Sequence, residues 1–332
     1  MFTAACGRPA APPVQVPTGP FVWHLPAGVP TPRVPADNPM SVAKVELGRR
    51  LFYDTRLSGN RTYACASCHE QRLAFTDGRA HAIGSTGAEH PRSAMGLGNI
   101  AYNLTFGWSD PSLRSPEAQA AVPMFNEHPV ELGLKGREAE VATRFTAAAD
   151  TAFFAASFPG TGPAVSVDHI IKAIATFERT LISGDTPFDR YLYRDDRTAL
   201  SDPARRGMAL FFSTRLKCSE CHSGFNLSGP VLAEGVEAGE PQFHHTGVGK
   251  FRAPTLRNIA VTAPYMHDGS LPTLEAVVAH YATGGVASPL KSDRLKGFRI
   301  SPTEANDLVA FLKSLTDDGF LTNPAFARPV VR

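Results

Sequence analysis

Two short motifs constrain this chain more than any other feature. Both have the form Cys-x-x-Cys-His, reading Cys-Ala-Ser-Cys-His at 65–69 and Cys-Ser-Glu-Cys-His at 218–222. This pattern is typical of c-type haem attachment, in which both thiols form thioethers with haem vinyl groups and the adjacent histidine ligates the iron. The sequence therefore predicts two haem c groups, attached through Cys65, Cys68 and His69 and through Cys218, Cys221 and His222.

Two other chemistries could use paired cysteines. A zinc site could combine the two cysteine pairs, but it would leave the histidine after each pair unexplained. A redox-active dithiol usually lacks the following histidine and would not occur twice. Both alternatives fit the pattern less well than haem attachment. We also expect the second ring nitrogen of each motif histidine to bond a neighbouring acceptor.

The chain also contains an internal repeat. Residues 47–57 and 206–216 precede the two motifs and share a Gly, a Phe and a Thr-Arg-Leu triplet at matching places. Each copy predicts an amphipathic helix that runs into a haem-binding turn. A length of 332 residues agrees with roughly two domains. We predict a Pro-rich arm or tether over 1–38, an N-terminal domain over 39–196, a C-terminal domain over 197–322 and a tail over 323–332.

Strand signals are weak, so the predicted fold class is all-α: two tandem cytochrome c-like domains, each with one covalently bound haem c and long irregular loops. The 28 glycines and 28 prolines account for the expected irregular backbone. Helical patterns recur at about 40–54, 136–156, 166–182, 202–213, 272–282 and 302–315. Residues 184–200 are the predicted link between the domains.

Composition excludes several classes of protein. The net charge of +2, with no run of Lys or Arg, argues against nucleic-acid binding. No apolar stretch is long enough to predict a transmembrane helix. Haem c is attached outside the cytoplasm, so we expect an exported, periplasmic protein. Residues 1–6 do not form a complete signal peptide. Cys6, which follows small residues, is either a lipid-anchor cysteine or a stray tail cysteine.

Further segments, in order along the chain, resemble one family. They are Ala-Phe-Thr-Asp-Gly-Arg at 74–79, Pro-Thr-Leu-Arg-Asn at 254–258 and Pro-Tyr-Met-His-Asp-Gly at 264–269. With the two haem motifs, they resemble the bacterial di-haem cytochrome c peroxidase and MauG superfamily over roughly residues 38–320. Residues 122–133 look most like its methanobactin-associated MbnH subgroup. The resemblance implies a peroxide-reactive haem on His69 and a relay haem on His222.

The resemblance also implies a sixth ligand for the relay haem. Many family members use a methionine here, whereas the matching position in this sequence is Tyr281, as in MauG. A phenolate bound to ferric iron favours higher oxidation states than a thioether does. His280 is a competing ligand, and Tyr281 could alternatively only cap a helix. Met266 is expected to pack rather than ligate, and His267 is expected to bond a haem propionate, as His244 and His245 could also do.

Four further residues correspond to the family's catalytic positions. Trp108 matches a tryptophan that bridges the two haems, although a buried core position is compatible with this. Glu131 matches a distal carboxylate that takes and returns the peroxide proton, with Glu127 as its rival. Gln119 matches a nearby glutamine, and Pro123 would hinder a sixth ligand. His81 and His90 lie where some members place a removable distal histidine.

The family also has a calcium site between the haems. The matching positions are Ser93, where the family has an asparagine, and the backbone carbonyls of Thr262 and Pro264. Because a serine hydroxyl is a weaker oxygen donor, calcium is possible here but not strongly predicted. MauG also has a surface tryptophan beside its second haem motif, and residues 215–217 of this chain contain none. A protein substrate must therefore dock differently.

These features favour one function over two alternatives. The first is a di-haem oxidoreductase that uses H₂O₂ to form a high-valent, bis-Fe(IV)-type state and oxidises a residue of a partner protein. The MbnH resemblance implies a tryptophan of an MbnP-like copper-binding partner. The second is a cytochrome c peroxidase that reduces H₂O₂ with electrons from a small cytochrome or cupredoxin. The third is an electron-transfer di-haem cytochrome, which would leave Glu131 and Pro123 without a purpose.

Overall fold

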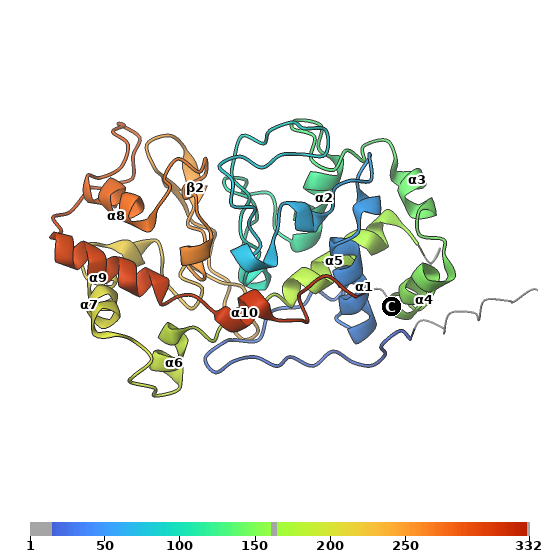
Figure 1. Cartoon of the computed structure of the whole chain (residues 1–332), viewed down its shortest axis with the longest axis horizontal. Coiled ribbons are helices and arrows are strands. Elements are labelled where there is room, and N and C mark those ends of the chain that lie inside the picture. Colours follow the sequence, from blue (N-terminus) through green and yellow to red (C-terminus); the bar gives the residue numbers. More distant parts are fainter. Residues whose placement is uncertain (1–14, 161–164, 331–332) are drawn as a thin grey trace, which may run out of the picture.

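The computed structural model describes residues 15–160 and 165–330, and it divides into two lobes that lie side by side (Figure 1). One lobe contains α1 to α5, the other contains α6 to α9 with a small hairpin, and α10 lies between them. The helices are α1 (Val42–Phe52), α2 (Pro116–Phe125), α3 (Glu138–Thr143), α4 (Ala148–Ser157), α5 (Val167–Arg179), α6 (Pro187–Tyr193), α7 (Asp202–Phe211), α8 (Leu274–Ala282), α9 (Pro302–Lys313) and α10 (Asp318–Thr322). The antiparallel strands are β1 (Phe243–His245) and β2 (Lys250–Arg252).

Local sequence explains where most helices begin. A Ser or Thr side chain caps the first turn of α1, α2, α5, α6, α7, α8 and α9 by accepting a backbone N–H. Proline follows the cap in α2, α6, α7 and α9, where its missing N–H has no helical partner to lose. The mostly helical prediction is confirmed.

One predicted helix is wrong, and several elements were not predicted. The helix expected over 136–156 is two helices, α3 and α4, because the chain turns at Arg144. Its guanidinium is directed inward and donates to the carbonyls of Arg56 (2.6 Å) and Ser58 (2.8 Å). The link expected over 184–200 contains α6, which a capping box of Thr186 and Asp189 stabilises. The helices α2 and α10 and the β1–β2 hairpin were also not predicted.

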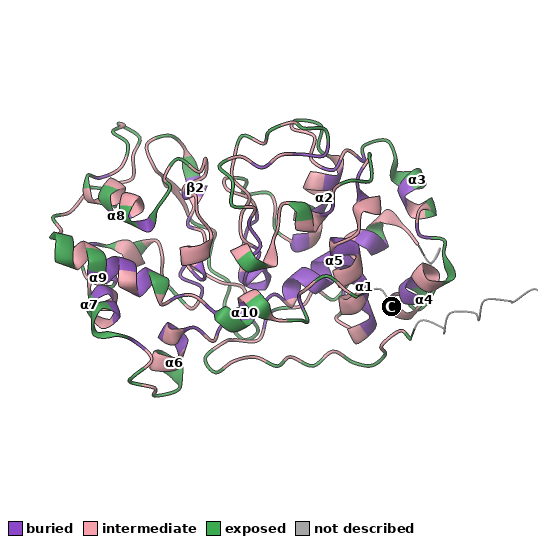
Figure 2. Ribbon diagram, in the orientation of Figure 1, coloured by how far each residue is buried: buried purple, intermediate pink, exposed green. Residues whose placement is uncertain are grey.

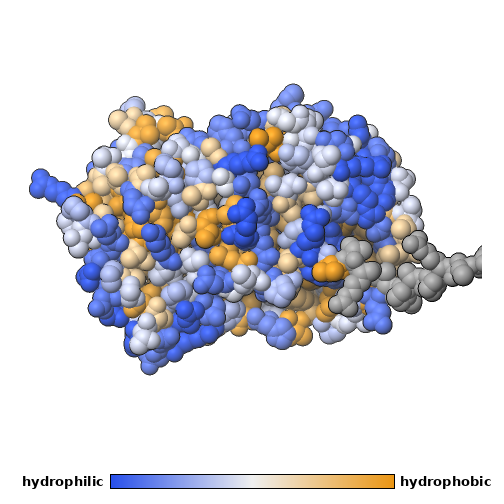
Figure 3. Space-filling model, viewed as in Figure 1, coloured by the Kyte–Doolittle hydropathy of each residue, from blue (hydrophilic) through white to orange (hydrophobic). Residues whose placement is uncertain are grey.

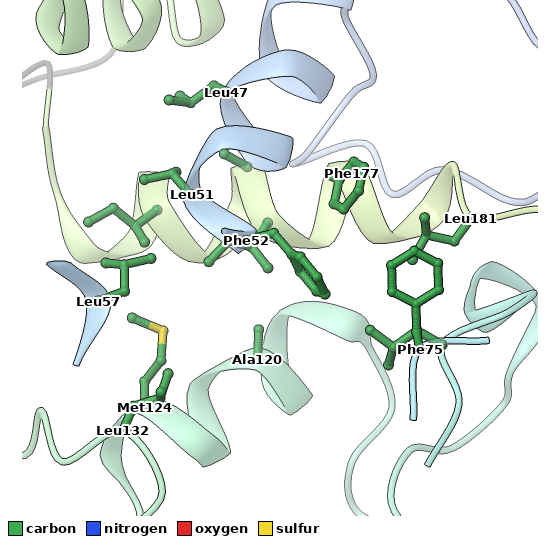
Figure 4. Packing of buried hydrophobic residues seen from close by; sticks show 14 of the residues in the cluster. Leu47, Leu51, Phe52, Leu57, Phe75, Ala120, Met124, Leu132, Phe177 and Leu181 are labelled. Atoms are coloured by element: carbon green, nitrogen blue, oxygen red, sulfur yellow. The ribbon is translucent and has the colours of Figure 1, made fainter. Parts of the chain in front are cut away.

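The internal repeat is visible in the packing of helix pairs. α1 crosses α5 in the first lobe, and α7 crosses α9 in the second. At each crossing a repeat glycine makes the closest approach: a side chain at Gly48 would overlap the Ala173 carbonyl, and one at Gly207 would overlap the Asp307 carbonyl. Figure 4 shows the first crossing, where Phe52 of α1 packs on Phe177 of α5 (ring centroids 5.3 Å apart). Each pair supplies one core.

Buried residues gather at these crossings and in parts of the adjoining loops, while the outer loops are mostly exposed or half-buried (Figure 2). One hydrophobic cluster gathers residues from 47 to 181 and also takes in Phe320 and Phe326 from the end of the chain. The other gathers residues from 188 to 315. The C-terminal segment therefore returns to the first lobe, where Tyr53 donates to the Phe326 carbonyl at 2.7 Å.

The described part of the Pro-rich arm, from residue 15, is extended and runs along the first lobe as far as the second (Figure 1). The Tyr102 hydroxyl donates to the Pro30 carbonyl at 2.6 Å, and Gly28 lies beneath the Tyr193 ring of α6. Cys6 lies outside the described residues. In the part of the chain that the structure describes, no helix is long and apolar enough to span a membrane. The surface in Figure 3 is predominantly hydrophilic, with an apolar patch over the loops beside α8.

Candidate functional site: two Cys-x-x-Cys-His turns and the cavity between them

The first motif forms a tight turn that fixes its histidine. Cys65–Ser67 is a single 3₁₀ turn, and the His69 backbone N–H donates to the Cys65 carbonyl at 3.1 Å. The His69 ring donates from Nδ1 to the Phe75 carbonyl at 2.7 Å. Phe75 has a left-handed backbone (φ 64°), which directs that carbonyl towards the ring. Nε2 is then the nitrogen with a free lone pair, as a metal ligand requires.

The second motif repeats this arrangement. Cys218–Glu220 is a 3₁₀ turn, and the His222 backbone N–H donates to the Cys218 carbonyl at 3.0 Å. Its Nδ1 donates to the Leu227 carbonyl at 3.0 Å, and Leu227 is also left-handed (φ 49°). The expected acceptor for the second ring nitrogen is thus present in both turns.

The electrostatics of both turns suit a neutral ligand set. Burial lowers the pKa of the His69 and His222 imidazoles, which keeps them uncharged and able to donate a lone pair. Burial also raises the pKa of the Cys68 and Cys218 thiols to about 11. No disulfide joins the four motif cysteines. Among residues 15–160 and 165–330, no three His, Cys, Asp or Glu side chains converge as a metal cluster would require, so the two cysteine pairs do not form a joint zinc site.

Near the first motif, two carboxyls have a raised pKa. Glu178 on α5 is buried, and burial raises its pKa to about 8. Burial is the main cause of the raised pKa of the Cys65 thiol, and the charges of Glu178 and, less strongly, Glu131 raise it further. Glu131 is half-buried, and burial alone raises its pKa to about 7. The chain holds it through the Glu131 carbonyl, which accepts from the Ser85 N–H at 2.7 Å. Its rival Glu127 is exposed on the surface. The structure therefore separates the two carboxylates that the sequence left as alternatives.

Gln119 and Pro123 lie one turn apart on α2. The Pro123 carbonyl accepts from the Leu132 N–H at 2.8 Å, which ties this helix to the segment that carries Glu131. The Gln119 Oε1 atom is buried without a hydrogen-bond partner and lies 3.8 Å from the position a side chain would take at Gly107. A buried acceptor that no described residue bonds fits a site that receives a further polar guest.

The second motif opens on a cavity of about 340 Å³. His222 and Tyr281 both line it, and burial raises the pKa of the Tyr281 phenol to about 12. His280 is not among its lining residues, and its imidazole instead lies edge-on to the Tyr281 ring, with centroids 5.4 Å apart. The His244 Nε2 atom is buried in this wall with no partner. A large cavity with a histidine, a phenol and an orphaned ring nitrogen fits a bound haem.

Trp108 lies in the wall of the same cavity and is held from both lobes. Its indole Nε1 donates to the Ser93 carbonyl at 3.0 Å, and its own carbonyl accepts from the backbone N–H of Arg252 at 3.1 Å. Ser93 in turn donates from its N–H to the His267 carbonyl at 3.0 Å. The tryptophan is thus a fixed bridge between the lobes.

The predicted calcium donors lie near this bridge. The Ser93 hydroxyl donates to the Met266 carbonyl at 3.1 Å, while Thr262 and Pro264 line the cavity. Because Ca²⁺ takes six to eight oxygen ligands, these three donors would need water molecules to complete a coordination shell. Ser93 also ties its segment to the 264–269 loop by direct hydrogen bonds.

The other histidines lie either in the wall of this cavity or outside it. His267 lines the cavity and stacks on Phe251, with ring centroids 4.2 Å apart, as a propionate partner could. His245 accepts from the Gly247 N–H through Nδ1, and His90 bonds the backbone of Arg92. His81 and His90 are not among the residues that line the cavity.

Several residues that organise the site were not predicted from the sequence. Arg252 in the cavity wall is one, and the buried ion pair between Arg257 and Asp189 (2.7 Å) is another. A further part of the internal repeat was also missed. The triplet Asn-Ile-Ala occurs at 99–101 and 258–260, with the same offset as the repeat glycines. Both asparagines are left-handed (φ 61°) and begin a 3₁₀ turn.

Comparisons with known proteins agree with this geometry. The family model described as di-haem cytochrome c peroxidase matches residues 42–197, and a RoxA-like, cytochrome c-like model matches 250–282. Methylamine utilization protein MauG of Methylorubrum extorquens is 36% identical over 302 residues, covering 88% of this chain and 83% of that protein. Cytochrome-c peroxidase IdrP1 of Denitromonas iodatirespirans is 37% identical over 326 residues, covering 85% and 84%. A crystal structure of a MauG-like protein associated with microbial copper homeostasis superposes with a TM-score of 0.89 at 40% identity, covering 93% and 99%.

Proposed function

Because the chain belongs to the di-haem cytochrome c peroxidase and MauG family and is a haem oxidoreductase, we propose that it uses H₂O₂ to oxidise a residue, a tryptophan, of a partner protein in the periplasm. The observation that carries this proposal is Tyr281, a buried phenol that shares a cavity with His222. A phenolate at this position favours oxidised iron, which suits a protein that stores oxidising equivalents for a slow protein substrate.

In this proposal each half of the chain, residues 39–196 and 197–322, carries one haem c. Cys65, Cys68 and His69 hold the first, and Cys218, Cys221, His222 and Tyr281 hold the second. When bound, the two haems supply the redox chemistry by accepting the oxidising equivalents of peroxide. The carbonyls at Phe75 and Leu227 fix the proximal rings, so neither imidazole can turn away from its metal.

The protein's own residues then control the proton. Glu131 takes the proton from one peroxide oxygen at its carboxylate and returns it to the other oxygen, so that water can leave. A pKa of about 7 suits both halves of that transfer at neutral pH. Gln119 orients the oxygen through its free amide, and Pro123 keeps the site closed to a protein ligand. Trp108 relays the electron hole between the halves.

The proposed identity of the partner protein comes from a comparison with a solved structure. One solved structure that closely resembles this chain is of a MauG-like protein associated with copper homeostasis. We therefore propose an MbnP-like copper-binding protein as substrate, oxidised at a tryptophan to kynurenine. Two H₂O₂ molecules supply the four oxidising equivalents that give N-formylkynurenine and two waters, and hydrolysis then releases the formyl carbon as formate.

The test uses the fully ferric holoenzyme and one equivalent of H₂O₂, followed in the visible and near-infrared. We expect a long-lived oxidised species with a near-infrared band. After the partner protein and a second equivalent of H₂O₂ are added, mass spectrometry should show one partner tryptophan in which one carbon is replaced by one oxygen, as in kynurenine. The control is the same addition to Tyr281→Met. If the unaltered protein reacts only after one haem is reduced, and electrons from a small cytochrome are consumed, the chain is a peroxidase like several of its named relatives.

A further inference from the structure

One cation in the cavity wall has no counter-charge. Arg252 at the end of β2 donates from Nε to the Gly107 carbonyl at 2.8 Å and from Nη2 to the Met95 sulfur at 3.5 Å. Neither acceptor carries charge, and Nη1 has no protein partner among the described residues. Burial, with no compensating carboxylate, lowers the pKa of this guanidinium to about 10.

The other cations of the cavity are neutralised or exposed. Of the seven Lys and Arg residues in its lining, five have a carboxylate within 4 Å: Arg215, Lys217, Arg257, Arg294 and Lys296. Arg79 is exposed to solvent. Within the described part of the chain, Arg252 is therefore the interior cation of this cavity that lacks an anion.

Arg252 is half-buried, and a cation withdrawn from water without a counter-charge is costly. A guanidinium is shaped to bind a carboxylate with two parallel hydrogen bonds. The cavity also contains His222 and Tyr281, which hold the second haem in the proposed function. Haem carries two propionate carboxylates, so the group that fills this cavity brings the missing anion with it. A freely diffusing anion would have to compete with a covalently attached one.

We propose that Arg252 is a positioning residue that binds a haem propionate beside Trp108 and, through its charge, raises the reduction potential of that haem. This inference rests on the proposed function in one respect only, which is that a haem fills the cavity. The same guanidinium holds the Gly107 carbonyl, and its backbone N–H holds the Trp108 carbonyl. One residue thus fixes the cofactor edge and the bridging indole relative to each other.

The test is a redox titration of the holoenzyme with no peroxide and no protein substrate, comparing three variants. Arg252→Met removes the charge at similar length, and Arg252→Lys retains it. Arg215→Met removes a charge from the same cavity lining, but from an exposed side chain paired with Glu304. We expect Arg252→Met to lower the midpoint potential of one haem by about a tenfold change in its reduction equilibrium, 59 mV for one electron. Arg252→Lys should recover most of this shift.

Resonance Raman spectra give a second readout, because the propionate-bending band should shift in Arg252→Met and not in Arg215→Met. Haem content and the Soret spectrum check that each variant is loaded and folded. The inference is wrong if Arg252→Met binds both haems and their potentials and the propionate band are unchanged. It is also wrong if Arg215→Met shifts a potential or the band by the same amount. Failure of the proposed function would appear instead in the peroxide experiment, with these potentials unaffected.

Discussion

The two Cys-x-x-Cys-His turns are nearly the same structure in two different surroundings. Both turns are 3₁₀, both histidines donate from Nδ1 to a carbonyl of a left-handed residue, and both follow a helix that crosses its partner at a glycine. The surroundings differ: the first turn has the half-buried acid Glu131 and the buried acid Glu178 near Cys65, and the second shares a cavity with the phenol of Tyr281. The attachment unit is duplicated, and the chemistry around it is not.

In the proposed function, the different roles of the two haems therefore come from segments far from each motif. An acid near a buried haem can move a proton but leaves the metal open, whereas a phenol can occupy the metal and stabilise its oxidised form. Glu131 follows α2, and Tyr281 is on α8. Neither belongs to the repeated unit, so each half could acquire its role while the attachment turn stayed unchanged.

The largest expected effect tests the acid of the first half. Glu131→Gln should slow the reaction with peroxide by about 10²–10⁴-fold, because the amide cannot take up the proton. Stopped-flow absorbance measures this rate. Glu127→Gln, four residues away and exposed, is the matched control and should react as the unaltered protein does. If the rate falls equally in both variants, Glu131 does not have its proposed role, and the two halves do not differ in this respect.

The pH dependence of the same reaction sharpens the comparison. Glu131 acts as a base only when ionised, and burial raises its pKa to about 7. The rate should therefore fall as pH decreases below about 7 and level off above it. The Cys65 and Cys68 thiols, which couple to this carboxyl, cannot titrate once they are thioethers. A rate profile that is flat from pH 5 to 9, or one that Glu131→Gln leaves unchanged, would contradict this assignment.

The smallest expected effect concerns the helix crossing that both halves share. Gly48→Ala and Gly207→Ala should each lower the free energy of unfolding by about 1–3 kcal/mol, because the added methyl group meets a carbonyl of the crossing helix. Denaturant unfolding of the holoenzyme measures both. Gly319→Ala on exposed α10 should be neutral or slightly stabilising, since alanine favours helix. A loss in one half alone would mean that the two crossings are not equivalent.

Much of this could be predicted from the sequence, and the exceptions have physical causes. The motifs and the helices begun by Ser or Thr caps depend on local chemistry, which short segments carry. The single helix expected over 136–156 failed because Arg144 bonds carbonyls nearly ninety positions earlier, a contact that no local pattern reveals. α2 was missed because Pro123 lies inside it, and prolines are rare inside helices. The Pro123 carbonyl nevertheless has a partner, because it accepts a hydrogen bond from the Leu132 N–H.

By itself the sequence determined the chemistry of attachment, the repeat and the residue types available for each role, because these depend on covalent spacing. Only the tertiary structure showed that Glu131 is half-buried while Glu127 is exposed, placed Tyr281 but not His280 in the cavity lining, and left Arg252 with no carboxylate partner among the described residues. Burial and proximity set pKa values and open coordination positions, and both are properties of chain segments that meet only after folding.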